Sequence, residues 1–542
     1  MNAGSQAVFR TELTPLSLLA RSADVFPDKD AVVYRDRRLT YREFAAAATR
    51  LARALQASGI EPGDRVAYLM PNLPELLIAH FGVPLAGAVL VSINTRLSPE
   101  EVAYILEHSG ARILVVDAEL AVPLGTLGFQ LPESVEEVVT VTDPAAPGPD
   151  TPALTGPDYD GLLARGTDEP LPWTVPDETA MITLNYTSGT TGRPKGVMYH
   201  HRGAYLNSLG EQIHSGFGTD SVYLWTLPMF HCNGWCTTWG VTGAGGTHVC
   251  LRSVDAAEIW RLIDTEGVTH LDGAPVVMST IANHPGAHPL ERPVVVTTAG
   301  AAPSPTIIEQ MARLGATIVH VYGLTETYGP YAICERQPGW SELEVAELAR
   351  LMSRQGVGMV CADRIRVVDE AMDDVPGDAL TMGEIVMRGN NVMTGYFNDP
   401  EATATAFRGG WFHSGDLGVL HPDGYVELRD RAKDIVVSGG ENISTVEVER
   451  ALLSHPAVLE AAVIGAPDDK WGERPKAFVV VRAGQTVEPA ALVEHVRNQI
   501  AHFKAPREVE IIPELPKTST GKIQKYNLRE REWAGHTSRI KG

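Results

Sequence analysis

The sequence predicts an α/β protein with a large multi-layer N-terminal domain and a small α+β C-terminal domain. Along the first part of the chain, short apolar strands alternate with segments of helical period, which is typical of parallel α/β layers. The charge then changes: residues 431–542 carry 17 Lys and Arg against 15 Asp and Glu, whereas residues 1–430 carry 28 against 52. We therefore expect one domain over residues 1–430 and a second over residues 431–542.

The first elements follow from apolar spacing and from the residues that stop each run. Residues 43–58 (EFAAAATRLARALQAS) have helical spacing, and Gly59 and Pro62-Gly63 end the run. The same reasoning predicts strands over 65–70 and 113–116 and helices over 74–86 and 99–109.

Later regions complete the pattern. Residues 145–176 are rich in Pro, Gly, Asp and Thr, which indicates a surface connection. Residues 340–355 are charged and helix-prone, and we interpret them as an inserted surface helix. Further predicted elements are helices over 309–314 and 489–502 and strands over 317–321, 461–464, 476–481 and 509–512.

Composition excludes several classes of function. The net charge of −22 makes the chain a poor general binder of nucleic acid or of anionic membranes. Five cysteines are too few for a disulfide framework, and neither a signal peptide nor an apolar run long enough to span a bilayer is present. We expect a cytoplasmic protein with no transmembrane segment.

A loop rich in glycine and hydroxyl side chains is the first candidate site. Residues 180–186 read as a strand, the loop follows as TSGTTGRPKG over 187–196, and a helix-like run comes next, with His200 and His201 on a solvated face. Small residues allow close approach of an anion, and Lys195 adds positive charge. The loop is not a Walker A motif, and no GxGxxG follows a strand.

The full string YTSGTTGRPKGV over 186–197 resembles the phosphate loop of the adenylate-forming superfamily, which includes acyl-CoA synthetases. The other motifs of that family follow in order over roughly residues 15–530. They are PMFH at 228–231, YGLTE at 322–326, SGD at 414–416, RAKD at 431–434, GGEN at 439–442 and PKTSTGK at 516–522. The inserted stretch 340–355 is similar to that of a short- and medium-chain subgroup that includes methylmercaptopropionate-CoA ligases.

The resemblance implies ATP and CoA as co-substrates and Mg²⁺ as the cofactor. A carboxylate attacks the α-phosphate of ATP to give acyl-AMP and pyrophosphate, and the CoA thiol then displaces AMP. Lys522 would reach the α-phosphate, Glu326 and Thr187 would hold Mg²⁺, and Thr325 would contact the α-phosphate. The remaining phosphate-loop residues implied are Ser188, Gly189, Thr190, Thr191, Gly192 and Lys195.

The same resemblance assigns the nucleoside contacts and the moving parts. Tyr322 would stack on adenine beside Gly323, with Gly300, Ala301 and Ala302 flanking the base, and Asp416 and Arg431 would bind the ribose. Lys433 matches the hinge about which the C-terminal domain rotates between the two half-reactions. After rotation, that domain would present Gly439, Gly440 and Glu441 for the thiol step.

The acyl site is implied near Phe230 and His231, where His231 either positions the substrate or shields the adenylate from water. Trp235 matches a gate that closes the acyl tunnel, with core packing as the alternative. Cys232 and Cys236 lack the partners of a zinc site. An apolar pocket suited to a short acid is expected from Trp225, Met229, Trp235 and Trp239.

The sequence therefore predicts an acyl-CoA synthetase for a short- or medium-chain fatty acid or a similar small apolar acid. An aryl acid of the benzoate or cinnamate type is an alternative. An adenylating enzyme that loads a carrier protein is another, although no acid follows His231 to hold an amino group. No nucleic acid partner is expected, and a homodimer stays open.

Overall fold

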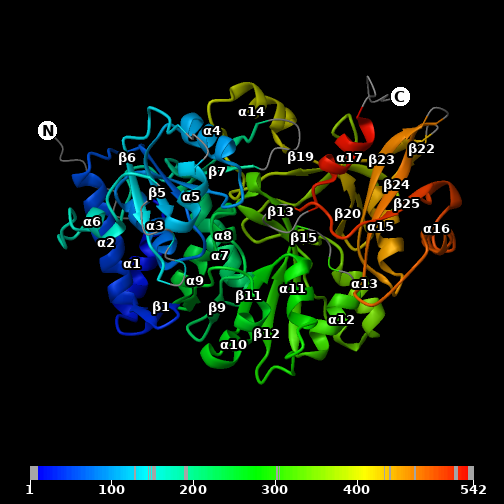
Figure 1. Ribbon diagram of the computed structural model, residues 1–542, viewed down its shortest axis with the longest axis horizontal. Coiled ribbons are helices and arrows are strands. Elements are labelled where there is room, and N and C mark those ends of the chain that lie inside the picture. The colour runs from blue at the N-terminus through cyan, green and yellow to red at the C-terminus, as the bar shows by residue number, and fades with distance from the viewer. Residues whose placement is uncertain are drawn as a thin grey trace.

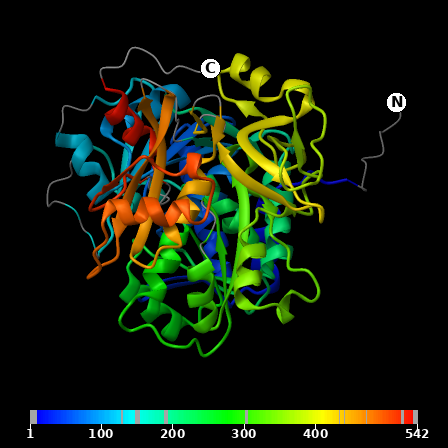
Figure 2. The same ribbon diagram turned by 90° about the vertical axis from the view of Figure 1, so that its right-hand side faces the viewer.

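The computed structural model (Figures 1 and 2) describes residues 10–126, 130–144, 146, 148, 154–187, 193–300, 303, 305–431, 434–438, 441–468, 471–517 and 523–534. Two large sheets and a smaller one fill the N-terminal part, and a further sheet lies at the right of Figure 1 in orange. The predicted α/β fold with a small C-terminal domain is confirmed. In the described part, no helix is both long and apolar enough to cross a bilayer.

The first large sheet has seven strands in the order β18-β8-β7-β4-β3-β5-β6. Five of them run parallel, from β7 to β6, and their near-continuous apolar sequences suit a sheet that is covered on both faces. The strands are β3 (Arg65–Leu69), β4 (Val89–Ile93), β5 (Ala111–Asp117), β6 (Glu137–Val141), β7 (Met181–Tyr186), β8 (Gly196–His200) and β18 (Gly395–Tyr396).

The second large sheet has nine strands in the order β15-β14-β13-β12-β11-β9-β10-β1-β2. Its central strands are parallel, whereas β2, β14 and β15 are antiparallel to their neighbours. The strands are β1 (Asp30–Tyr34), β2 (Arg37–Thr40), β9 (Val222–Leu224), β10 (Thr247–Val249), β11 (His270–Gly273), β12 (Val294–Thr298), β13 (Ala316–Leu324), β14 (Gly329–Ile333) and β15 (Val357–Gly358).

Helices form three layers around these two sheets. The middle layer shares one apolar core with both sheets, and it contains α1 (Leu16–Val25), α2 (Tyr41–Ala57), α3 (Pro74–Leu85), α7 (His201–Ser215) and α9 (Thr237–Ala244). The outer layers contain α4 (Pro99–Ser109) and α5 (Ala118–Thr126) on one side and α10 (Ala256–Glu266), α11 (Pro275–Ala282), α12 (Pro305–Arg313) and α13 (Val345–Met352) on the other. Shorter pieces are α6 (Tyr159–Leu163), α8 (Cys232–Trp235), α14 (Pro400–Ala406) and the 3₁₀ turns η1 (Thr325–Thr327), η2 (Trp340–Glu342) and η3 (Arg408–Gly410).

A four-stranded antiparallel sheet connects the large sheets to the C-terminal region. Its order is β16-β17-β19-β20, and Asp416 on β19 is directly opposite Arg431 on β20. The strands are β16 (Arg366–Val368), β17 (Met382–Met387), β19 (Phe412–Leu420) and β20 (Val426–Arg431).

The C-terminal region builds its own sheet and its own core. The sheet runs β22-β21-β24-β23, and β25 pairs with β24, while apolar residues of α15 and α16 pack against it. The elements are β21 (Val436–Ser438), β22 (Glu441–Ile443), α15 (Thr445–Leu453), β23 (Val458–Asp468), β24 (Gly472–Val481), α16 (Pro489–Arg497), η4 (His502–Lys504), β25 (Glu508–Ile511) and α17 (Lys525–Trp533).

Two local predictions were wrong. The run after the glycine-rich loop is strand β8, which pairs antiparallel with β7, and helix α7 begins only at His201. His201 is not on a solvated face: it is 5% exposed, and its Nδ1 lies 2.9 Å from the Thr14 hydroxyl. The side chain of His200 caps the helix by accepting a hydrogen bond from the Gly203 N–H.

Candidate active site

The two ends of the glycine-rich loop are held together by β7 and β8. The Thr187 N–H donates to the Lys195 carbonyl at 3.0 Å, and the Lys195 N–H donates to the Thr187 hydroxyl at 3.3 Å. Residues 188–192, predicted to bind phosphate, lie outside the described residues. The Lys195 ammonium lies 4.7 Å from the centre of the Tyr396 ring, a distance suited to a cation–π interaction.

Tyr396 also contacts the carboxylate that we expect to hold Mg²⁺. Strand β18 brings it beside β8, and its hydroxyl donates to Glu326 Oε1 at 2.8 Å. Burial raises the pKa of Glu326, although the side chain keeps partial exposure, and the Tyr396 hydrogen bond opposes that rise. Tyr396 thus contacts both Lys195 and Glu326, and Lys195 in turn is hydrogen-bonded to Thr187.

The donor types at this position fit Mg²⁺. A carboxylate and a hydroxyl are hard oxygen ligands, and Mg²⁺ at nucleotide sites commonly takes one or two protein ligands together with phosphate oxygens and water. Among the described residues, no three His, Cys, Asp or Glu side chains gather into a metal site. The pair Glu326 and Thr187 therefore suits an ion that arrives with the phosphates.

Tyr322, Asp416 and Arg431, which are predicted to contact the nucleoside, meet near the C-terminal end of β13. The Tyr322 hydroxyl donates to Asp416 Oδ2 at 2.7 Å, and the Arg431 Nε lies 3.3 Å from Asp416 Oδ1. Tyr322 and Asp416 are 8% and 4% exposed. Burial raises the pKa of Tyr322 well above its ordinary value, and the neighbouring Asp416 charge adds to this, so the hydroxyl keeps its proton.

The β19 backbone makes an irregular turn at Gly415 (φ +70°), next to Asp416, and this turn is supported from β17. Glu384 Oε1 accepts the Gly415 N–H at 3.1 Å, and its Oε2 lies 2.8 Å from His413 Nδ1. The Ser414 hydroxyl donates to the Ile385 carbonyl at 2.6 Å. Sequence reasoning missed Glu384, because only the pairing of β17 with β19 brings it to this turn.

The predicted glycines at the nucleotide site differ in their surroundings. Gly300 follows β12 with φ +85°, and a Cβ there would meet no atom within 4 Å, so the space beside it is open. A Cβ on Gly323 would lie 1.8 Å from the Gly329 carbonyl oxygen, so this glycine is required by the packing of β13 on β14. Ala301 and Ala302 lie outside the described residues.

Thr325 connects the nucleotide segment to the predicted acyl segment. Its carbonyl accepts the Tyr199 hydroxyl at 2.6 Å, and its own hydroxyl lies 3.7 Å from the sulfur of Cys232. That sulfur lies 3.8 Å from Nε2 of His231. His231, which is partly exposed, therefore lies close to the YGLTE motif.

The segment after His231 has an unusual backbone. All five residues from 232 to 236 have φ between 52° and 65°, the left-handed region that costs non-glycine residues energy. Gly234 allows this turn to pack on Trp225, where a Cβ would lie 2.4 Å from the ring. Asn233 is fully buried, and its Oδ1 accepts hydrogen bonds from Thr183 and Asn185 at 2.8 and 3.0 Å.

Another buried asparagine fixes the chain before Phe230. The Asn72 side chain donates to the carbonyls of Trp225 and Leu227, both at 2.9 Å, and accepts the Met229 N–H at 2.7 Å. Phe230 itself is 9% exposed. The only signal for Asn72 in the sequence is weak: its position between a strand and the proline that starts α3.

The prediction that four side chains form an apolar pocket was wrong for three of them. Trp225, Met229 and Trp239 are fully buried in the main core, and the indole N–H groups of the two tryptophans donate to His248 and to the His80 carbonyl. Trp235 instead belongs to a small separate cluster. Its members include Leu227, Cys232, Val321, Ile333 and Met359, with Ala299, Val319 and Cys361 packed against them.

The two cysteines beside His231 are buried. Burial raises the pKa of Cys232 to about 12 and that of Cys236 well above its ordinary value. Both thiols therefore keep their protons in the metal-free protein at neutral pH.

Much of the predicted moving machinery falls outside the described residues: Lys433, Gly439, Gly440 and Lys522. Glu441 is exposed at the start of β22, which pairs antiparallel with β21. Lys517 and Ile523 form an antiparallel bridge on either side of the segment that contains Lys522.

Asp430, next to Arg431, joins β20 to the C-terminal region. Its carboxylate accepts the Thr445 hydroxyl at 2.7 Å, and Ser444 donates to the Arg429 carbonyl at 2.6 Å. The Lys525 ammonium lies 2.7 Å from the same Thr445 hydroxyl and 2.8 Å from Glu449. The start of α17 is thereby fixed beside β20.

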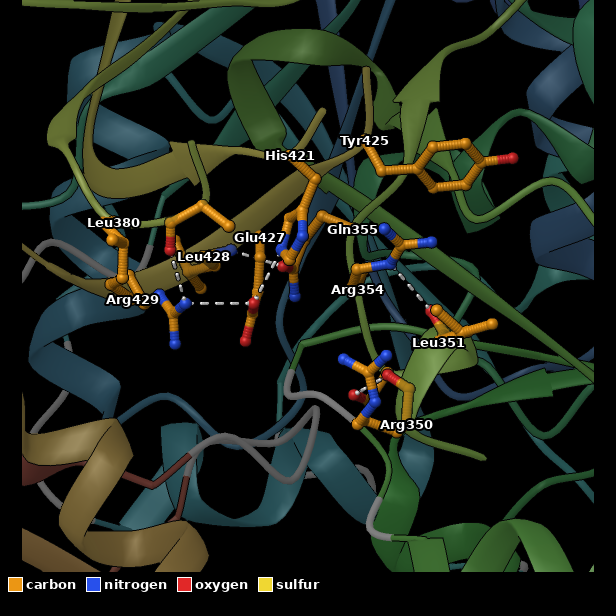
Figure 3. A network of polar contacts seen from close by, with 12 residues as sticks. Arg350, Leu351, Arg354, Gln355, Leu380, His421, Tyr425, Glu427, Leu428 and Arg429 are labelled. Carbon is orange, nitrogen blue, oxygen red and sulfur yellow. Dashed lines mark hydrogen bonds and ion pairs between the residues drawn. The ribbon is translucent and has the colours of Figure 1, made fainter. Parts of the chain in front are cut away.

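The inserted segment 340–355 contacts the hairpin that leads into β20, as Figure 3 shows. Arg354 is 3% exposed, binds both carboxylate oxygens of Asp423 and stacks on Tyr425 at 4.4 Å. The Gln355 side chain accepts the Leu428 N–H. Segment 340–355 forms η2 and helix α13, so the predicted helix is present. Its end packs on the hairpin, so the prediction of a surface helix is confirmed only in part.

Glu427 on this hairpin contacts the C-terminal region directly. Its carboxylate pairs with Arg450 of α15 and, at 2.9 Å, with His421, and Arg429 lies 3.3 Å away. Burial by itself would raise the pKa of Glu427, but the positive charges of Arg450 and Arg429 outweigh it and hold the pKa below its ordinary value.

Comparison with known proteins agrees with this arrangement. The family model described as AMP-binding enzyme matches residues 19–397, and that described as AMP-binding enzyme C-terminal domain matches residues 447–522. The chain is 44% identical to 4-hydroxybutyrate–CoA ligase 2 of Metallosphaera sedula, over 95% of this chain and 94% of the relative. It is 41% identical to a peroxisomal trans-cinnamate:CoA ligase of Petunia hybrida, over 96% and 94%.

Solved structures give the same result. The anthranilate CoA ligase AuaEII with anthranoyl-AMP superimposes with a TM-score of 0.83 at 25% identity, over 97% of this chain and 98% of that one. ATP-bound MatB from Rhodopseudomonas palustris gives 0.82 at 28% identity, over 95% and 98%. The chain therefore belongs to the AMP-binding enzyme family, and it is an ATP-dependent acid–CoA ligase.

Proposed function

We propose that this acyl-CoA synthetase acts on a short- or medium-chain fatty acid or a similarly small acid. In the first step the carboxylate oxygen attacks the α-phosphate of ATP, which forms acyl-AMP and expels pyrophosphate. In the second step the CoA thiol attacks the acyl carbon, loses its proton and expels AMP. Domains over residues 1–430 and 431–542 would alternate between these steps about Lys433.

The observation that carries the nucleotide assignment is the convergence of Tyr322, Asp416 and Arg431. A carboxylate can accept both ribose hydroxyls, and the ion pair with Arg431 orients the Asp416 side chain. The Tyr322 hydroxyl is occupied by Asp416, which leaves the ring face for adenine. Open space beside Gly300 supports the placement of the base there.

The phosphates would lie at the Thr187–Lys195 loop. Lys195 and the loop N–H groups would bind them, and Lys522 would arrive from the C-terminal domain to neutralise the developing charge. Mg²⁺, held by Glu326 and Thr187, would offset the negative charge of the triphosphate. Tyr396 would orient Glu326 for that role through its 2.8 Å hydrogen bond.

The small size of the acid is supported by Trp235 and its cluster. Trp235 is 5% exposed and contacts apolar side chains from β13, β14 and the segment before β16. We infer that this cluster borders the acyl site and limits the length of the acid. Relatives named for acetate, 4-hydroxybutyrate and trans-cinnamate support a carboxylate substrate while they differ in its size.

The test is AMP and acyl-CoA formation with a panel of acids. The panel contains acetate, butyrate, hexanoate, 4-hydroxybutyrate, benzoate and cinnamate, each with ATP, Mg²⁺ and CoA. We expect the largest kcat/KM with a short aliphatic acid. A largest value with benzoate or cinnamate would contradict the substrate class, and release of neither AMP nor pyrophosphate with any acid would contradict the activity.

A further inference from the structure

A pair of buried carboxyl groups lies close to the Trp235 cluster and has no part in the chemistry above. Glu211 on α7 and Asp272 on β11 are each 2% exposed. Asp272 accepts the Tyr223 hydroxyl at 2.8 Å, but Glu211 Oε1 has no hydrogen-bond partner within the described ranges. A buried polar atom without a partner is costly, which indicates a missing partner.

The strand register places Asp272 in line with the Trp235 cluster. Asp272 is opposite Thr297 on β12, and Thr297 is opposite Val319 on β13, so the three share one row on one face of the sheet. Val319 packs against the cluster that contains Trp235. The row lies three residues before Tyr322 on β13, or about 10 Å along the strand from the nucleotide site.

Helix α7 brings Glu211 to the same place from the other side. Asn207 and Glu211 are one turn apart and both buried, so they share a face of α7. The Asn207 amide donates to the Trp235 carbonyl at 3.5 Å. Gly210, next to Glu211, packs closely on Cys361: a Cβ on Gly210 would lie 3.1 Å from the Cys361 sulfur, and Cys361 packs against the Trp235 cluster.

We propose that Glu211, together with Asp272, lies at the far end of the acyl site and binds the terminal hydroxyl of a short ω-hydroxy acid. The inference rests on the proposed function, because it assigns an end to the same acyl site. A hydroxyl both donates and accepts, so it supplies the partner that Glu211 Oε1 lacks. An alkyl chain of the same length that lacks the hydroxyl cannot supply this hydrogen-bond partner.

The raised pKa of Glu211 favours a hydroxyl over an ammonium group at its side chain. Burial raises the pKa of Glu211 well above its ordinary value, and Asp272 adds to the rise, while burial raises the pKa of Asp272 to about 7. At neutral pH Glu211 is therefore a neutral acid, with one donor and one acceptor. Moving a cation into such surroundings costs more than moving a hydroxyl.

The experiment compares kcat/KM for 4-hydroxybutyrate, butyrate and 4-aminobutyrate in the full-length enzyme, by AMP release. We expect 4-hydroxybutyrate to be preferred, and Glu211→Leu to reduce the ratio of 4-hydroxybutyrate to butyrate by about 10-fold or more. Glu211→Gln keeps a donor and an acceptor and should keep most of the preference. Removing an unpaired buried acid should not unfold the protein.

Gln212→Leu is the matched control, because it makes the same kind of change at the next residue of α7, whose side chain points to α1 and Gly243. It should leave the ratio unchanged. An unchanged ratio in Glu211→Leu, or a wild type that prefers butyrate or 4-aminobutyrate, would overturn the inference while leaving the ligase activity intact. Failure of every acid to yield AMP would instead overturn the proposed function.

Discussion

The hydroxyl of Tyr322 donates a 2.7 Å hydrogen bond to one oxygen of Asp416, whose other oxygen lies 3.3 Å from Nε of Arg431. The three residues come from β13, β19 and β20, so two different sheets meet at this point. Because β20 leads into the C-terminal region, Arg431 would serve both the proposed nucleotide site and the proposed connection to a moving domain.

Asp416→Ala should raise the KM for ATP by about 10-fold or more, because a charged group that binds the ribose is lost while the reacting atoms are untouched. Steady-state kinetics with ATP and with CoA as the varied substrate would measure this. The KM for CoA serves as the control and should change little. An unchanged KM for ATP would remove Asp416 from the nucleotide site.

Gly234→Ala should lower stability by about 1–3 kcal/mol more than Gly216→Ala does. Both glycines have positive φ, but a Cβ on Gly234 meets the Trp225 ring at 2.4 Å, whereas a Cβ on Gly216 meets nothing within 4 Å. Urea unfolding of the two variants separates the clash from the backbone strain. Equal losses would mean that the ring moves aside without cost.

The free energy of unfolding should fall at acid pH because the stabilising contribution of the Glu427 carboxylate is lost there. Its pKa is lower in the folded chain, so its contribution is complete above the ordinary value of about 4.3 and is lost as the pH falls through the folded value. Glu427→Gln should cost about 1 kcal/mol at neutral pH, since Arg450 is partly exposed, and should weaken the acid dependence.

The control for that variant is Glu347→Gln, which removes the same charge from an exposed pair with Arg350 on α13. Urea midpoints between pH 3 and 7 would be compared. If the wild type and Glu427→Gln give parallel curves, the Glu427–Arg450 pair does not contribute to the contact between β20 and α15.

Lys433→Pro should slow thioester formation more than adenylation. Within the described residues, the Asp434 N–H donates to the Arg431 carbonyl. A proline at position 433 would fix the backbone φ angle between these two residues. Pyrophosphate exchange measures the first step, and acyl-CoA formation measures both. Lys433→Ala, which keeps the backbone free, should retain more of the second step; equal loss of both steps in the proline variant would count against rotation.

The sequence predicts elements well where local signals agree. Helix α4 was expected over 99–109 and spans Pro99–Ser109, because Ser98 and Glu101 form a capping box and Gly110 ends the helix with φ 61°. The helix expected over 489–502 ends at Arg497, and a turn separates it from η4, which begins at His502; the run of helical spacing includes no clear stop.

The candidate site residues that the sequence predicts belong to continuous motifs, and the sequence does not reveal those that strand pairing or packing brings to the same place. Tyr396 reaches Glu326 across 70 positions of sequence, and Asn72 reaches Trp225 across 153. Glu211 and Asp272 look like ordinary surface acids in sequence; only their burial distinguishes them. The pocket expected from Trp225, Met229 and Trp239 failed for the same reason, since the sequence does not tell which sheet face is core.

The most direct test of the account is acid-dependent ATP–pyrophosphate exchange in wild type and in Lys522→Ala. We predict exchange in the wild type with its preferred acid and a loss of about 10²–10³-fold in the variant, the usual effect of removing a transition-state donor. Lys517→Ala is the control: Lys517 is paired with Glu460, and its loss should leave exchange largely intact. Undiminished exchange in Lys522→Ala would contradict the proposed mechanism.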